Sequence, residues 1–92
     1  MYYVYIIFRE RNEELSFYTG QTNNLEARWK RHKNGYTKAN KSFNLMGLQP
    51  LFSFNTLKEA MRMEKKVKHW TFDEKLWWYD NGSMELIKDE NM

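Results

Sequence analysis

The segment from Tyr2 to Phe8 places the strongest constraint on how this chain folds. It is an uninterrupted run of aromatic and β-branched residues, a composition that favours a β-strand. Both alternating sets of side chains are apolar, so we expect the strand to be covered on both faces. The run is far shorter than the roughly 18 apolar residues that a membrane-spanning helix needs. No basic segment precedes it, so we expect a cytoplasmic protein that is not exported and does not bind membranes.

The length of 92 residues fits one domain, in which catalysis and substrate binding would share one core. We interpret residues 1–92 as a single unit with a motif-bearing core at about 2–70, a C-terminal helix at about 73–80 and a frayed tail. The chain has no cysteine, which excludes disulfides and thiolate metal sites such as zinc ribbons.

The first half of the chain is expected to form a hairpin followed by a helix. The polar segment Arg9–Glu14 is interpreted as a loop, and Leu15–Thr22 as a second strand that pairs antiparallel with the first. A helix then begins at Leu25 after an asparagine cap. On this helix Arg28 and His32 are four residues apart and flank its short apolar stripe, so both side chains are expected to face the sheet.

The second half is expected to begin with another helix, over residues 37–46, that ends at Gly47. Pro50 then opens a third strand over Leu51–Phe54, because proline is tolerated at the first residue of a strand.

Two further helices are expected in the remaining part of the chain. The clearer one runs over Leu57–Trp70 with Thr56 as its cap. Glu64 lies about 30° from the centre of its apolar side, where a carboxylate is costly unless something binds it. A final helix follows Asp73 as its cap and ends at Asn81-Gly82.

Positive charge is concentrated in two segments, although the net charge is only +3. Residues 28–41 contain no acid, whereas residues 58–68 mix basic and acidic side chains. Both segments suit contact with phosphates, and the alternative is that they are the solvated faces of two helices. The candidates for nucleic-acid contact are Lys30, Arg31, Lys33, Lys38, Lys41, Arg62, Lys65 and Lys68.

Taken one at a time, the polar residues of interest have structural explanations. Strand tyrosines usually pack, an arginine beside Trp29 can cover the ring, and a histidine or an acid can be a satisfied structural group. Their order along the chain adds information. Four segments together resemble the GIY-YIG nuclease family over residues 2 to about 70: Tyr3-Val4-Tyr5, Tyr18-Thr19-Gly20, Asn24 to His32 and Ala60 to Glu64.

The resemblance extends to particular subgroups of that family. The segment from Leu25 to His32 is similar to the catalytic helix of phage GIY-YIG homing endonucleases. The segment from Thr56 to Trp70 is similar to the small stand-alone bacterial members. Two departures from the family name are visible, since Tyr3 replaces the first glycine and Thr19 the middle isoleucine of the second tripeptide.

This resemblance implies an α/β fold with a three-stranded antiparallel sheet flanked by helices, and an endonuclease that hydrolyses phosphodiester bonds in nucleic acid, with DNA as the expected substrate. The catalytic residues that it implies are Tyr5, Tyr18, Arg28, His32 and Glu64. Glu64 would anchor a single Mg²⁺ (or Mn²⁺), which keeps several waters and needs few protein ligands. Arg28 would contact the phosphate, and Tyr5 would orient or deprotonate the attacking water.

Two other functions remain open at this stage. The chain can be a nucleic-acid-binding module of the same fold with little turnover, because small domains of this kind can cut poorly without a targeting domain, although all five implied catalytic positions keep their functional groups. Phosphate contacts by lysine and arginine would give it limited sequence specificity. It can also be an interaction domain, because the Trp77-Trp78-Tyr79 cluster offers more aromatic surface than one short helix buries. The ring that the core does not bury would support a homodimer or contact with another partner.

Overall fold

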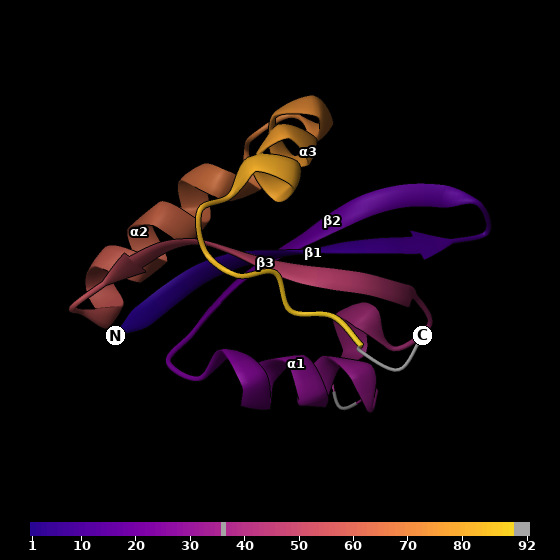
Figure 1. Cartoon of the computed structure of the whole chain (residues 1–92), viewed down its shortest axis with the longest axis horizontal. Helices are drawn as coiled ribbons and strands as arrows, with labels where there is room; N and C mark the ends of the chain where they lie inside the picture. The colour runs from indigo at the N-terminus through magenta and orange to yellow at the C-terminus, as the bar shows by residue number, and fades with distance from the viewer. Residues whose placement is uncertain (36, 90–92) are drawn as a thin grey trace.

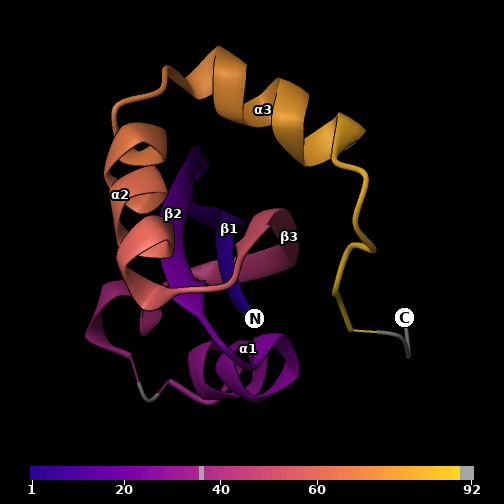
Figure 2. The same cartoon turned by 90° about the vertical axis from the view of Figure 1, so that its left-hand side faces the viewer.

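A three-stranded antiparallel sheet in the order β2-β1-β3 forms the centre of the computed structural model, which describes residues 1–35 and 37–89. Helix α1 lies on one face of the sheet, and α2 and α3 lie on the other (Figure 1 and Figure 2). The expected α/β fold is therefore confirmed. The elements are β1 (Tyr2–Arg11), β2 (Glu14–Thr22), α1 (Leu25–Lys33), the short 3₁₀ helix η1 (Lys38–Asn40), β3 (Asn44–Phe54), α2 (Leu57–Lys68) and α3 (Phe72–Asn81).

The central strand β1 is buried on both faces, as its apolar run predicted. The residues from Val4 to Ile7 have no exposed surface. Val4 and Ile6 pack in the cluster formed with α2, whereas Tyr5 and Ile7 pack with Trp29 of α1. Burial of each such side chain contributes about 1.5–3 kcal/mol to the free energy of folding. The sheet is therefore fixed between two separate apolar layers.

The polar segment Arg9–Glu14 is not a loop, which corrects the expectation from sequence. β1 extends to Arg11, and a tight turn at Asn12 and Glu13 connects it to β2. Both turn residues have positive φ values, 54° and 67°. Such turns match the twist of antiparallel strands, and strand pairing uses the backbone, so polar side chains do not prevent it.

The helix predicted over residues 37–46 is also wrong. Among the described residues only η1 is helical there, and β3 begins at Asn44 rather than at Leu51. The strand passes through both Gly47 and Pro50, where its pairing with β1 shifts register. Bulges of this kind accommodate residues that usually end a strand or a helix.

The helices of the second half are close to the prediction but differ at their ends. α2 begins after Thr56, whose side chain accepts the backbone N–H of Glu59, and it ends at Lys68 rather than at Trp70. α3 is capped by Thr71 and not by Asp73, through a reciprocal pair of hydrogen bonds with Glu74. No helix among the described residues has the length and apolar character needed to cross a membrane.

The chain after α3 is ordered as far as it is described, which corrects the expected frayed tail for residues 82–89. This segment returns across the sheet to the side of α1 (Figure 2). Ile87 exchanges both backbone hydrogen bonds with Leu48 of β3, at 2.8 and 2.9 Å. Residues 90–92, which also belong to the predicted tail, lie outside the described residues.

Candidate active site

Tyr5 lies at the centre of the face that α1 covers. It is fully buried, and its partner across the sheet is Gly20 of β2. A Cβ atom at Gly20 would lie 2.5 Å from the Tyr5 hydroxyl oxygen and 3.2 Å from Cε2 of Tyr18. Only glycine therefore leaves room for the two tyrosines to meet at this position. Tyr3 projects on the same side of β1, but pairing with Gly20 distinguishes Tyr5 from it.

Helix α1 brings His32 to the same place. Its N-terminus is fixed by Asn24, whose side chain accepts the backbone N–H of Ala27 at 3.1 Å. His32 is 2% exposed, and its Nε2 lies 3.0 Å from the Tyr5 hydroxyl oxygen. The imidazole also meets the ring of Tyr18 edge-on, with centroids 5.2 Å apart. The spacing on α1 thus predicted the direction of His32 correctly.

Arg28 completes this group from the preceding turn of α1. Its side chain is partly buried and approaches the carbonyl oxygen of Gln21 at 3.5 Å. The contact is long for a hydrogen bond, so most of the five guanidinium donors are unused by the described residues. Tyr5, Tyr18, Arg28 and His32 therefore share one site between α1 and the β1-β2 pair.

Burial dominates the electrostatics of this group. It raises the pKa of Tyr5 well above the usual range, with the neighbouring Tyr18 hydroxyl adding to the rise and Arg28 opposing it. Burial, together with the positive charges of Arg28 and Arg31, lowers the pKa of His32 to about 4. At neutral pH Tyr5 is therefore protonated and His32 is a neutral imidazole.

Glu64 approaches from α2. The side chain is 20% exposed, and its carboxylate pairs with Lys68 one turn later at 3.4 Å. Its negative charge makes the smallest of the contributions to the raised pKa of Tyr5, and α2 packs on the face of the sheet opposite α1, so Glu64 is not in contact with the group around Tyr5 among the described interactions. Beside it is an open hollow of about 660 Å³, with an apolar part formed by Leu57 and Met61.

The predicted nucleic-acid contacts are spread over the two sides of this site. Lys30, Arg31, Lys38 and Lys41 are exposed on and after α1, and Arg62, Lys65 and Lys68 are exposed on α2. Arg62, Lys65 and Lys68 also line the hollow next to Glu64. Lys33 differs from these residues, because its ammonium pairs with Asp89 of the C-terminal segment at 2.7 Å.

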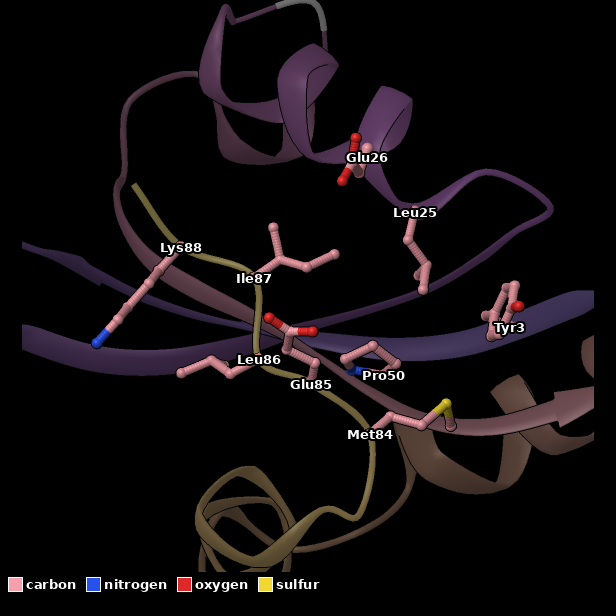
Figure 3. Close-up of a pocket in the computed structure, with 9 residues that line it drawn as sticks. All are labelled: Tyr3, Leu25, Glu26, Pro50, Met84, Glu85, Leu86, Ile87 and Lys88. Atoms are coloured by element: carbon pink, nitrogen blue, oxygen red, sulfur yellow. The ribbon is translucent and has the colours of Figure 1, made fainter. Parts of the chain in front are cut away.

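A second hollow, of about 560 Å³, lies between α1 and the C-terminal segment (Figure 3). It is lined by Tyr3 and Leu25 on one side and by Met84 to Lys88 on the other. None of the predicted catalytic residues lines it. The hollow is a product of the C-terminal segment and is separate from the group around Tyr5.

Two site residues were not identified from the sequence. Asn40 is 1% exposed and places its side-chain nitrogen 2.9 Å from Nδ1 of His32. Arg9 of β1 donates to the side-chain oxygen of Asn40 at 2.8 Å. Arg9 was expected in a loop and Asn40 in a helix, and no local pattern relates positions so far apart in the chain.

Comparison with known families matches residues 1–76 to the family described as "GIY-YIG catalytic domain". UPF0213 protein CPE1444 of Clostridium perfringens is 37% identical over 95 aligned residues, which cover 99% of this chain and 92% of that protein. UPF0213 protein BH0048 of Halalkalibacterium halodurans is 36% identical over 72 residues, covering 74% of this chain and 70% of that protein. No solved structure gives a significant match. The family match covers most of the chain, and the tyrosines and glycine of the hairpin and the α/β fold agree with it. The chain therefore belongs to the GIY-YIG family, which is of the nuclease type.

Proposed function

We propose that this protein is a divalent-metal-dependent endonuclease that hydrolyses phosphodiester bonds in nucleic acid, with DNA as the substrate. The observation that carries the proposal is the meeting of Tyr5, Tyr18, Arg28 and His32 beside Gly20 on the α1 side of the sheet. Hydroxyls, an imidazole and a guanidinium in one place suit phosphoryl chemistry, because they can orient water and balance charge on a phosphate, and we assign the carboxylate of Glu64 on α2 to a metal ion.

The donor chemistry at Glu64 fits a single Mg²⁺ or Mn²⁺. The described residues contain no group of three or more acidic, histidine or cysteine ligands, so a closed protein cage is not what the site offers. A lone carboxylate with one long ion pair is instead suited to a cation that retains water and shares substrate phosphate oxygens. When bound there, the ion would stabilise charge on the phosphate and on the leaving oxygen.

Arg28 and Tyr18 are the residues that we expect to contact substrate directly. The guanidinium of Arg28 has unused donors in a planar fork, which matches two oxygens of a phosphate. Tyr18 is partly exposed, and its hydroxyl is a candidate to orient the attacking water. Tyr5 is enclosed, and burial raises its pKa, so we now assign it a position behind Tyr18 and His32 rather than direct contact with bulk water.

The exposed basic residues support binding to the phosphate backbone. Cations on α1 and on α2 would hold the phosphate backbone from the two faces of the sheet, without identifying its sequence. This set comprises Lys30, Arg31, Lys38, Lys41, Arg62, Lys65 and Lys68.

The second candidate is a nucleic-acid-binding module with little turnover of its own. It is favoured by the enclosure of Tyr5, because a hydroxyl with no exposed surface and a raised pKa is not prepared to remove a proton from water. Under this reading the basic residues still bind DNA, and binding still weakens steeply with salt.

A homodimer is proposed on separate grounds. Trp77 remains 57% exposed and Phe72 40% exposed, although the neighbouring Trp78 packs against the core. Exposed aromatic rings are common at contacts between copies of a chain. Sedimentation of the wild type and of Trp77→Ser over a range of concentrations tests this, and a wild type that stays monomeric throughout contradicts it.

The nuclease proposal is tested by incubating the full chain with supercoiled plasmid and Mg²⁺ or Mn²⁺. Arg28→Ala and Glu64→Gln should abolish nicking, as should EDTA. Arg11→Ala and Glu14→Gln serve as matched controls, because both residues are exposed in the hairpin away from the site. Metal-dependent nicking that disappears only in the first pair supports the proposal. DNA that is shifted in a gel but never cut favours the binding module.

A further inference from the structure

A chain of buried and partly buried hydrogen bonds starts at the Tyr5 hydroxyl. The Tyr5 hydroxyl oxygen is 3.0 Å from Nε2 of His32, and Nδ1 of the same ring is 2.9 Å from the side-chain nitrogen of Asn40. The side-chain oxygen of Asn40 accepts from Nη1 of Arg9 at 2.8 Å. The chain therefore links a guanidinium on β1 to the candidate active site through an amide and an imidazole.

Arg9 determines which way the amide of Asn40 faces. A guanidinium has donors only, so the atom that meets Arg9 must be the amide oxygen. Arg9 is itself fixed, because it donates to Ser16 Oγ at 3.0 Å and to the carbonyl of Ala39 at 2.9 Å, and it lies 4.0 Å above the ring of Phe43. With its oxygen toward Arg9, Asn40 presents an N–H group to His32.

An N–H group at Nδ1 selects one form of the imidazole. A neutral histidine carries its proton on one nitrogen, so Nδ1 must be the acceptor and Nε2 must carry the hydrogen. We propose that Asn40, oriented by Arg9, is a positioning residue that holds His32 in the Nε2–H form. The hydroxyl of Thr37, 2.7 Å from Nδ1, can rotate to donate to the same nitrogen. Protonation of Nδ1 would place two N–H groups against each other, which agrees with the lowered pKa of His32.

The consequence for the site rests on the proposed nuclease function. His32 donates to the oxygen of Tyr5, so the proton of Tyr5 is not used by His32 and remains available to an acceptor on the substrate. A hydrogen bond donated to that oxygen also favours its charged form and so opposes the effect of burial. The opposite form of His32 would accept the proton of Tyr5 and hold it away from the reaction.

The hydrogen position is measured by ¹⁵N NMR of the histidine side chains in the full chain. The two histidines are assigned with a His69→Gln variant. The wild type should show the Nε2–H pattern for His32. In Asn40→Asp the carboxylate keeps its contact with Arg9 but accepts a hydrogen, so the pattern should change to Nδ1–H or to the charged imidazolium. Asn44→Asp, an exposed position on β3, is the matched control and should not change it.

A wild type with Nδ1–H, or an unchanged pattern in folded Asn40→Asp, overturns the proposal. If Asn40→Asp does not fold, the same NMR measurement on Arg9→Met tests the proposal. Without the arginine the amide can turn over, so both forms of His32 should appear, and a pure Nε2–H pattern contradicts the role of Arg9.

The nicking assay tests whether the form of His32 affects the rate, separately from whether the protein is a nuclease. Asn40→Asp should nick plasmid roughly tenfold more slowly, the effect of one misdirected hydrogen bond, with little change in KM. A changed pattern with an unchanged rate overturns the catalytic consequence. A wild type that shows the Nε2–H pattern but never nicks supports the positioning and contradicts the proposed function.

Discussion

Adding one methyl group at Gly20 should destabilise the protein because the space is already occupied. The Cβ of alanine would lie 2.5 Å from the hydroxyl oxygen of Tyr5 and 2.7 Å from its Cζ, both far inside van der Waals contact. Tyr5 cannot move away easily, since it has no exposed surface and its hydroxyl is bonded to His32 at 3.0 Å. Either β2 moves away from β1 or the tyrosine ring shifts and breaks that bond.

The size of the effect follows from three contributions. Overpacking of a buried site costs about 1–3 kcal/mol, and loss of the hydrogen bond between Tyr5 and His32 adds about 1 kcal/mol. Replacing a strand glycine by alanine returns about 0.5–1 kcal/mol through the unfolded chain. The net loss for Gly20→Ala is therefore about 2 kcal/mol, which lowers the melting temperature of a domain of this size by roughly 8–16 °C.

Urea unfolding followed by circular dichroism measures this loss. Ser53→Ala, at an exposed position on β3, is the control, and its unfolding free energy should stay within about 0.5 kcal/mol of the wild type. In a Tyr5→Phe background, which lacks the hydroxyl oxygen, Gly20→Ala should cost about 1 kcal/mol less. A neutral Gly20→Ala, or costs that simply add in the double variant, would refute the packing argument.

Four other outcomes are expected. Thr19→Val should raise the unfolding free energy by about 1 kcal/mol, because the buried Thr19 hydroxyl has no partner among the described residues; chemical denaturation measures this. Burial lowers the pKa of His32 to about 4 from 6.5, so the unfolded chain binds more protons between these values. The unfolding free energy should fall by roughly 3 kcal/mol as pH drops through that window, and the difference from His32→Gln isolates this part. Arg28→Lys keeps the charge but loses the fork, and the nicking rate should fall about 100-fold. Lys65→Ala should reduce the slope of log affinity against log salt by about 1 in fluorescence-anisotropy titrations with DNA.

The parts of the fold that follow from local patterns were predictable from the sequence. The apolar run around Val4 and Ile6 requires cover on both faces wherever it is placed, and α2 has both a threonine cap and a regular apolar side. The segment from residue 37 to 54 was misread, because Gly47 and Pro50 usually end elements. In this fold they lie at register shifts that only the pairing of β3 with β1 explains.

The candidate site also contains both predictable residues and residues that depend on long-range contacts. The direction of His32 follows from helical spacing, whereas Tyr3 and Tyr5 are equivalent by strand periodicity and differ only in what they meet across the sheet. Asn40 and Arg9 interact over 31 positions of sequence. Such a contact depends on where η1 lies beside the hairpin, which no local pattern determines.

The bridge between Ile87 and Leu48 affects the tendency of the protein to aggregate. β3 is an outer strand of 11 residues, and an outer strand of this length offers unpaired backbone groups on which foreign strands can assemble. The returning segment interrupts that row near its middle and covers it with Leu86 and Ile87. A chain cut at residue 76, where the family match ends, would retain the tyrosines, Arg28, His32 and Glu64. It would also expose the unpaired backbone groups along the edge of β3, and it should therefore aggregate. In this protein the cover of the β3 edge is therefore supplied by residues outside the part that matches the family.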